Sequence, residues 1–308
     1  MADYDLVVVG DVNPDLVVRG EVRPEFGQAE RLVDDAQLVI GGSGAIMACG
    51  AARLDLRTVL CGAVGDDVFG RFMLDALGEA GVDTGGVIVS DGKRTGLSVI
   101  LSGAADRAIL TFAGSIGQLE IGDIDPDLVR SARHLHLSSY FLQRALHDGV
   151  LHLFGEAHRA GATTSVDPNW DPNGTWDGAL SGLLNETDVF LPNEAEARAV
   201  ARAVDATDAA RALALRAGVV AVKCGPAGAV AVEGEEAVRA AAPAVDVADT
   251  IGAGDAFDAG FVAARLSGWP LERCLRLGVA CGSLSTRAVG GTSAQPSMAE
   301  AQAAVENA

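Results

Sequence analysis

Lysine is almost absent from this sequence, which has only Lys93 and Lys223 among 23 basic residues, against 42 acidic ones. The formal net charge of -19 gives a surface that repels the phosphates of nucleic acids and of anionic membranes. No apolar run approaches the roughly 18 residues that a membrane helix needs. Residues 1–13 also lack the basic flank and cleavage site of a signal peptide. We therefore expect a cytoplasmic protein that binds neither nucleic acid nor membrane.

Several well-known binding motifs are missing too. The five cysteines are odd in number, fit no zinc-site spacing and stand among apolar or small residues, so we expect free buried thiols. The sequence has no P-loop motif GxxxxGK[ST] and no protein-kinase signature. The glycine pairs at 42–44 and 252–254 lack the third glycine of a dinucleotide fingerprint. A nucleotide site would have to be built in another way.

What the sequence does have is an alternation of short apolar runs with longer amphipathic segments. The apolar runs predict strands at residues 6–10, 58–62, 134–137, 164–167, 189–191, 219–223 and 229–232. The amphipathic segments predict helices at residues 44–53, 67–80, 149–160, 194–204, 208–217, 254–267 and 271–286. This order predicts a three-layer α/β fold, in which helices cover both faces of a mainly parallel sheet.

Two regions break the alternation, residues 17–40 and 95–112, which carry strand-like runs with polar partners. Residues 102–107 have the composition of a hairpin turn between two such runs. We expect the two regions to form one small sheet, inserted into a single domain that spans residues 1–308. Because exposed edges and apolar faces need covering, this small sheet would serve as a lid or as a dimer contact.

The segment 249–260, DTIGAGDAFDAG, combines a glycine-rich turn with the start of a helix. Such a turn presents several N–H groups at a helix N-terminus, where the helix dipole favours anions. Asp255 opens the helix and has two interpretations on spacing alone. It is either an N-terminal cap, a common role for Asp, or a base set beside a phosphate site.

Seven segments together resemble the ribokinase-like (PfkB) carbohydrate kinases, in the family's order and along almost the entire chain. Segment 249–260 resembles the second signature of that family, and GGSGA at 41–45 resembles its double-glycine signature. The other matching segments are GDVNPD at 10–15, GAVGDDVFG at 62–70, PNEAE at 192–196, VKCGPAGA at 222–229 and GGTSAQP at 290–296. The resemblance implies a ribokinase-like fold with a β-sheet lid.

For catalysis, the resemblance implies that Asp255 accepts the proton of the substrate hydroxyl. The backbone N–H groups of Gly252, Ala253 and Gly254 would then hold the charge of the transferring phosphoryl group, as an oxyanion hole does. Phosphoryl transfer from ATP needs this combination of positioning and charge stabilisation.

For the nucleotide and its metal, the resemblance assigns Asn193, Lys223, Gly225 and Gly228 to the ATP side of the site. Asn193 and Glu196 would also organise Mg2+, largely through water. The same pair fits a capping box at the start of a helix, and both interpretations can hold together.

A monovalent-cation site is also implied. Asp249 resembles the cation residue of the family, helped by backbone carbonyls near Ile251 and in the loop before Gly290. Activation by K+ is common in the family but not universal, so K+ stays optional.

On the sugar side, Asn13 and Asp15 would face the substrate hydroxyls. A carboxylate can accept two hydroxyl donors at once, so Asp15 is the stronger candidate. Gly41, Gly42 and Ser43 would let the backbone approach the sugar closely. An ordinary turn at residues 13–15 is the alternative.

Four positions depart from the family pattern. Ile46 stands where most members carry Asn, and Ser43 stands where ribokinases often carry Lys, so both argue against ribose. Asp171 stands where ketodeoxygluconate and fructose kinases carry Arg, and an acidic group there would disfavour an acidic sugar. Val279 stands where an adenine-side Asn is often found, which leaves backbone and apolar contacts to bind the base.

The sequence therefore predicts an ATP-dependent kinase for a hydroxyl of a sugar or sugar-like small molecule. A nucleoside kinase of the same fold stays open, since Ile46 suits a less polar substrate. A non-catalytic member that binds sugar or nucleotide is the other alternative, against which the intact 252–255 turn argues. Family habit also suggests a homodimer through the lid.

Overall fold

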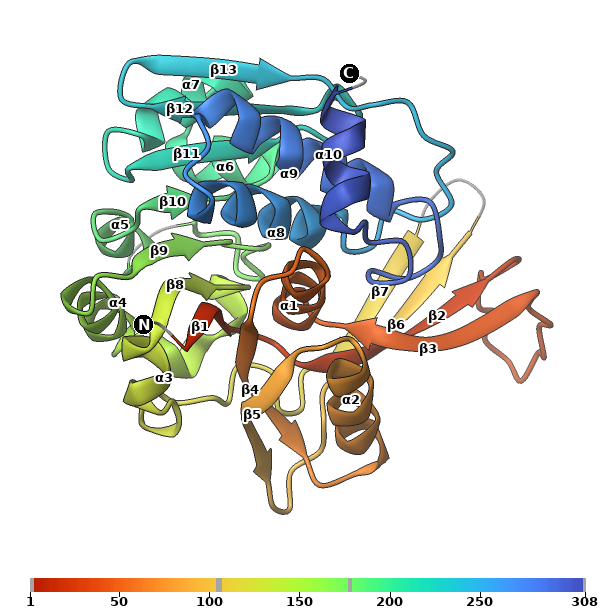
Figure 1. Cartoon of the computed structure of the whole chain (residues 1–308). Helices are drawn as coiled ribbons and strands as arrows, with labels where there is room; N and C mark the ends of the chain where they lie inside the picture. The colour runs from red at the N-terminus through yellow and green to blue at the C-terminus, as the bar shows by residue number, and fades with distance from the viewer. Residues whose placement is uncertain (1–2, 104–106, 177–178, 307–308) are drawn as a thin grey trace.

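The computed structural model of the chain describes residues 3–103, 107–176 and 179–306. A nine-stranded sheet runs through the molecule (Figure 1). Its strands, in spatial order, are β13 (Glu236–Ala240), β12 (Ala229–Glu233), β11 (Val219–Lys223), β10 (Val189–Phe190), β9 (Thr163–Val166), β8 (Ala132–Leu137), β1 (Tyr4–Val9), β4 (Thr58–Gly65) and β5 (Asp83–Ser90). All neighbours from β11 to β5 pair in parallel, while β12 and β13 are antiparallel additions at one edge.

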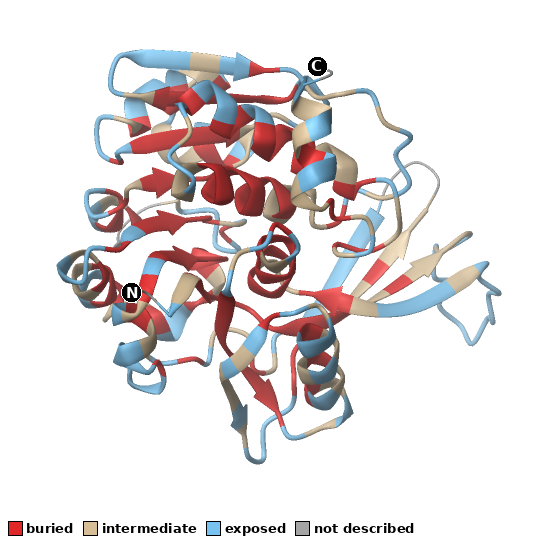
Figure 2. Cartoon of the chain, in the orientation of Figure 1, coloured by how far each residue is buried: buried red, intermediate tan, exposed pale blue. Residues whose placement is uncertain are grey.

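Helices cover both faces of this sheet, which confirms the expected three-layer fold. Each face of the sheet packs into a hydrophobic core of its own. In β1, for example, Leu6 and Val8 belong to one core, and Val7 and Val9 belong to the other. The first core is covered by α1 (Ser43–Arg53), α2 (Val68–Glu79), α8 (Ala253–Leu266), α9 (Leu271–Ser285) and α10 (Met298–Glu306). The second is covered by α3 (Pro126–Arg130), α4 (Val150–Arg159), α5 (Ala179–Leu184), α6 (Glu194–Ala201) and α7 (Ala206–Leu213). In Figure 2 the central strands and the helices α1 and α8 are coloured mostly as buried.

A second, four-stranded sheet projects from one side of the molecule (Figure 1). Its strands, in spatial order, are β3 (Asp35–Gly41), β2 (Asn13–Arg19), β6 (Leu97–Ser102) and β7 (Arg107–Phe112). The expected small sheet is therefore present, but β2 begins at Asn13 rather than at residue 17. Pairing of Ser102 with Arg107 agrees with the expected hairpin, whose turn residues 104–106 lie outside the described part of the chain.

Some elements differ from the sequence-based expectation. Strands β5 and β13 were not predicted, because both lie at sheet edges and carry glycines or charged residues instead of a continuous apolar run. Helices α3, α5 and α10 were also missed. Short 3-10 turns occur at Ile121–Asp123, Tyr140–Leu142, Arg144–Leu146 and Gly225–Ala227. The cysteines are free, as expected, and four of them are buried, but Cys224 is only partly buried and departs from the expectation.

Within the described ranges, no helix has both the length and the apolar character needed to cross a bilayer.

Candidate active site

A cavity of about 740 Å³ opens beyond the carboxyl ends of β9, β10 and β11, where α/β sheets usually bind ligands. Many of the residues singled out from sequence line its wall, namely Ser43, Asn193, Glu196, Lys223, Gly225, Gly228, Gly252, Ala253, Gly254 and Asp255. The other candidates, Asn13, Asp15, Gly41, Gly42, Asp249 and Ile251, do not line this cavity but lie in segments beside it.

The glycine-rich turn forms the N-terminus of α8. Gly252 is the N-cap residue with φ +70°, a left-handed conformation that favours glycine. A Cβ atom there would also lie 2.7 Å from the Cα of Gly291. The N–H groups of the first helical turn lack intrahelical acceptors, so this turn can bind an anion through backbone donors.

Asp255 lies in the first turn of α8, three residues after the N-cap, so it is not the helix cap. The interpretation of Asp255 as an N-terminal cap is therefore wrong. Burial raises the pKa of Asp255 well above its usual value, and the charge of Asp167 raises it further. The ammonium of Lys223 and a contact with the side chain of Ser43 act in the opposite direction. The carboxyl group therefore holds a proton more tightly than a free carboxylate does, and it lies beside a turn that could bind an anion.

Asn193 and Glu196 form the capping box that their spacing predicts at the start of α6. The Glu196 carboxylate accepts from the backbone N–H of Asn193 at 2.8 Å and from its Nδ2 at 2.6 Å, while Asn193 Oδ1 accepts from the N–H of Glu196 at 2.9 Å. Burial raises the pKa of Glu196 to about 7. Because both side chains line the cavity and carboxylate oxygens have further lone pairs, the pair fits a hydrated Mg2+.

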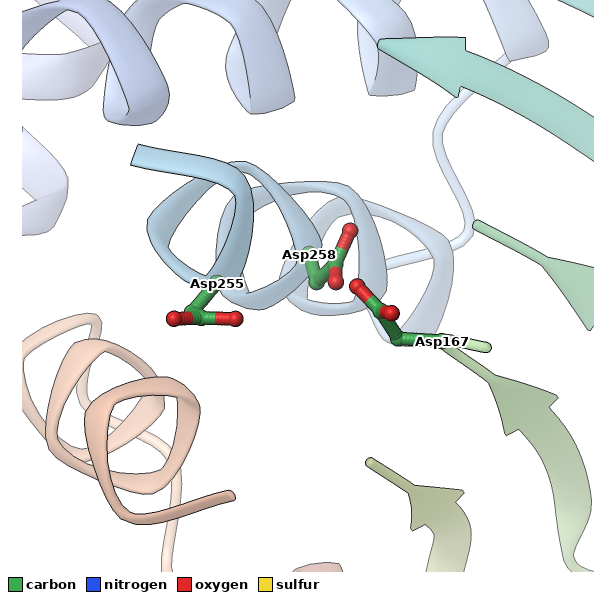
Figure 3. A group of neighbouring side chains, drawn as sticks. All are labelled: Asp167, Asp255 and Asp258. Carbon is green, nitrogen blue, oxygen red and sulfur yellow. The ribbon is translucent and has the colours of Figure 1, made fainter. Parts of the chain in front are cut away.

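Lys223 lies at the end of β11, and its ammonium points to two buried carboxylates. Nζ donates to Asp167 Oδ2 at 2.7 Å and to both carboxylate oxygens of Asp258 at 3.1 Å. Asp167 follows β9 and Asp258 lies one helical turn after Asp255 (Figure 3). Sequence reasoning missed both aspartates as site residues, although Asp258 lies inside the glycine-rich signature.

Of the candidates for the substrate side, Asn13, Asp15 and Gly41 lie on the small sheet, whereas Gly42 and Ser43 begin α1. Asp15 on β2 shares one row and one face with Val39 on β3, Ser98 on β6 and Thr111 on β7. Val39 lies against Gly290 of the main domain, so this face looks toward the site. Asn13 Nδ2 approaches Asp15 Oδ1 at 3.4 Å. Burial raises the pKa of Asp15 to about 7, and the nearby Asp11 carboxylate adds to this shift.

Asp11 is a further buried acid that sequence reasoning did not select. Its carboxylate accepts from the backbone N–H groups of Ser43 at 3.1 Å and Gly44 at 3.0 Å, at the N-terminus of α1. Gly42, the N-cap of this helix, has φ +78° and packs closely on the backbone of Asp11. Together these contacts fix the double-glycine segment against the end of β1.

Asp249 holds the loop before the glycine-rich turn. Its carboxylate accepts from the backbone N–H groups of Ile251 at 3.0 Å and Gly290 at 3.1 Å. Nη1 of Arg107 lies 3.9 Å from Asp249 and donates to Thr250 Oγ1 at 3.0 Å. A side chain of the small sheet thus reaches the segment that leads to Gly252.

Two of the positions that depart from the family pattern lie outside the wall of this cavity. The carboxylate of Asp171 accepts from the backbone N–H groups of Asn173, Thr175 and Trp176 and stabilises its own loop. Ile46 is buried and packs against Gly252 and Gly291, so it supports the anion-binding turn from behind.

One wall of the cavity is largely apolar. It is formed by Val279, Phe257, Ala242, Pro243, Ala244, Val245 and Val247.

His134 and His136, which alternate on β8, are buried and hydrogen-bonded to Ser165, and burial lowers their pKa values to about 3 and about 4.

Comparison with known proteins agrees with this geometry. The family model described as "pfkB family carbohydrate kinase" matches residues 3–298. An ATP-dependent ribose-1-phosphate kinase from Halopiger xanaduensis is 32% identical, with 92% of this chain and 93% of that protein covered. A 5-dehydro-2-deoxygluconokinase from Geobacillus kaustophilus is 29% identical over 87% and 84% of the two chains.

Solved structures of sugar and nucleoside kinases resemble the whole chain. The ribokinase from Arabidopsis thaliana complexed with ribose and ATP has a TM-score of 0.84 at 26% identity, with 99% of each chain covered. The adenosine kinase from Sinorhizobium meliloti has a TM-score of 0.85 at 26% identity, with 100% of each chain covered.

Proposed function

The chain belongs to the pfkB family of carbohydrate kinases, and we propose that it transfers the γ-phosphoryl group of ATP to a hydroxyl of a sugar or sugar-like small molecule. The observation that carries this proposal is the position of Asp255. Its carboxyl group lies beside an anion-binding helix N-terminus, on the wall of one cavity that also contains the Asn193–Glu196 pair.

In this reaction the hydroxyl oxygen of the substrate attacks the γ-phosphorus of ATP. A new P–O bond forms, the bond from the γ-phosphorus to the β,γ-bridging oxygen breaks, and ADP leaves with that electron pair. Asp255 takes the hydroxyl proton, for which its raised pKa suits it. The N–H groups at Gly252, Ala253 and Gly254 stabilise the charge on the three equatorial oxygens of the phosphoryl group that is being transferred.

The apolar wall near Val279 suits an adenine ring, and the 225–228 turn lies on the same side of the cavity. An Escherichia coli protein described as a Ribokinase II, whose structure holds ATP and Mg2+, shares this fold at 22% identity and a TM-score of 0.88. Bound Mg2+ would neutralise phosphate charge, and Asn193 and Glu196 would hold it through water.

The sugar would lie between the main sheet and the row that contains Asp15 and Ser98 on the small sheet. Closure of this sheet as a lid would exclude water and limit ATP hydrolysis. The bond from Arg107 to Thr250 supports this role, because it joins the small sheet to the loop before Gly252. We also propose that the protein forms a homodimer through the outer face of the lid. We further propose that K+ binds at Asp249.

A nucleoside kinase is the second candidate, favoured by the likeness to adenosine kinase over the full chain. ADP release with Mg-ATP across pentoses, hexoses, their phosphates, keto-deoxy acids and nucleosides separates the two. The same panel is run with Asp255→Asn, whose amide cannot act as a base, and with and without K+.

We expect one substrate class to give activity that is lost by several orders of magnitude in the variant. Near-full activity of Asp255→Asn would overturn the assignment of the base. If no compound supports ADP release, a thermal-shift screen with the same panel tests the non-catalytic binding alternative.

A further inference from the structure

The strongest feature that the proposed reaction leaves unexplained is the charge cluster beneath the anion-binding turn. Carboxylate oxygens of Asp167, Asp255 and Asp258 lie within 4.8 Å of one another, an arrangement that could hold a metal ion (Figure 3). The ammonium of Lys223 lies between two of them, at 2.7 Å from Asp167 and 3.1 Å from Asp258. The ammonium of Lys223 therefore balances part of the negative charge of this cluster.

This lysine is unusually placed for a residue of its type. Its side chain is 12% exposed, and those of Asp167 and Asp258 are 9% and 1% exposed. Burial alone would lower the pKa of Lys223, but the two aspartates raise it above its usual value, so the ammonium stays charged. Removing one partner of such a buried group leaves the others uncompensated.

The contacts also join three elements that build the site. Asp167 follows β9, Lys223 ends β11, and Asp258 lies on α8 one turn beyond Asp255. Lys223 lies against the turn itself, because a Cβ atom on Gly254 would lie 3.6 Å from Nζ. The lysine thus has both the position and the charge to influence the turn and the base.

The charged groups around Asp255 shift its pKa in opposite directions, so the effect of Lys223 can be told apart from that of the acids. Asp167 and Asp11 raise the pKa of Asp255 beyond the effect of burial, and Lys223 lowers it. The titratable and polar groups that face this cluster come from several elements, namely Asp11 after β1, Ser43 on α1, His136 on β8, Glu196 on α6 and Asp258 on α8. Burial keeps His136 neutral, since its pKa is lowered to about 4.

We propose that Lys223 is a positioning residue for phosphoryl transfer, whose ammonium serves as a built-in cation that holds Asp167 and Asp258 under the anion-binding turn and keeps Asp255 available as a base. This inference rests on the proposed kinase function. It gives Lys223 a role through the carboxylates behind the turn, in place of direct binding of the nucleotide.

The first test is the pH dependence of kcat/KM for the substrate found in the activity panel. Lys223→Met removes the positive charge, so the acidic limb should move to higher pH, with about tenfold less ionised base for each pKa unit gained. Asp167→Asn removes a negative charge, so the limb should move to lower pH. The double variant removes both charges and should return the limb toward its wild-type position.

The second test is chemical rescue. Lys223→Ala leaves space beside the cavity, and ethylammonium, which is charged at neutral pH, should restore part of the lost kcat. Neutral ethanol at the same concentration should not. Lys93→Met changes the other lysine, which is exposed in the turn after β5, and is the control that should leave kcat and the pH profile unchanged.

The outcomes separate this inference from the kinase proposal. A wild-type protein that phosphorylates no compound refutes the proposed function. An active wild type whose acidic limb does not move in opposite directions in Lys223→Met and Asp167→Asn refutes the role of Lys223. If Lys223→Met does not fold, the comparison of Asp167→Asn with the double variant still decides, because these two proteins differ only in the charge of Lys223. The acidic limb should lie at higher pH in the double variant, whereas a purely structural role predicts the same limb in both.

Discussion

The carboxylate of Asp15 fills the space that a side chain on Gly41 would need, because a Cβ atom there would overlap Cγ and Oδ1 of Asp15. The two residues lie on paired strands, β2 and β3, at the end of the small sheet nearest the main domain. Position 41 therefore needs glycine, because Asp15 occupies the space of a side chain there. The carboxylate of Asp15 is in turn placed to accept substrate hydroxyls.

Gly41→Ala should therefore displace the Asp15 carboxylate and weaken the reaction on its sugar side. We expect kcat/KM for the sugar to fall on the order of 100-fold, as for a misplacement of about 1 Å. The KM for ATP should change little. Steady-state kinetics with each substrate varied in turn measure both effects. Gly78→Ala is the matched control, since a Cβ atom there meets no neighbour within 4 Å, and equal losses in both variants would contradict the argument.

Sugar binding should depend on pH through Asp15. Its pKa is raised to about 7, mainly by burial, so the carboxylate that accepts hydroxyl donors is lost as the pH falls through this value. The dissociation constant of the sugar, measured by calorimetry from pH 5.5 to 8.5, should increase toward acid. Asp15→Asn should bind more weakly and show a flatter pH profile. An unchanged profile in this variant would assign the titration to another group.

Asp255→Asn should make the protein more stable at pH 8 while it abolishes activity. The folded-state pKa lies above the unfolded one, so ionisation of Asp255 costs stability as the pH rises from the unfolded pKa through the folded one. The amide does not carry this cost. We expect Tm to rise by a few degrees at pH 8, with the difference disappearing near pH 4. Asp75→Asn, on the exposed side of α2, should not change Tm in this way.

Arg107→Ala should loosen the small sheet from the main domain, since its bond to Thr250 joins the two. We expect a several-fold higher KM for the sugar, together with more ATP hydrolysis per sugar phosphorylated. Separate assays of ADP and of sugar phosphate measure this ratio. Arg19→Ala is the control, because Arg19 lies in the same row of the sheet but does not line the cavity that contains Asp255. A ratio that stays at one in Arg107→Ala would argue against a lid.

The outer face of the small sheet should be a dimer contact. Leu38, Leu16, Val99 and Leu110 form one apolar row across it, and Leu110 is 63% exposed. Sedimentation velocity should give a dimer for the wild type and a monomer for Leu110→Asp. Leu215→Asp, exposed on the main domain, should remain dimeric. A monomeric wild type at assay concentration would remove this proposal.

Sequence alone predicted β1 and β4 well because both are largely buried on both faces and carry continuous runs of apolar or small residues. The edge strand β13 carries Glu236 and Arg239 and has no such run. The capping box of Asn193 and Glu196 was predicted correctly because it depends only on local spacing.

The charge cluster around Lys223 could not be predicted in this way. Its partners lie 56 and 35 residues away in the sequence, and they meet only when β9, β11 and α8 are packed together. The signature containing Asp255 pointed to the right turn, but nothing in the local sequence indicates that the lysine at the end of β11 points inward beneath this turn.

The strand order has a consequence for how the protein folds. β1, near the start of the chain, lies between β4 and β8, and β2 pairs in parallel with β6. Neither sheet can close around these early strands until more than a hundred residues have left the ribosome, and Asp255 arrives much later still. Such long-range pairing makes folding slow and leaves apolar edges open during synthesis. We therefore expect a nascent chain ending before α8 to hold a sheet without its covering helix, and to depend on chaperones in that interval.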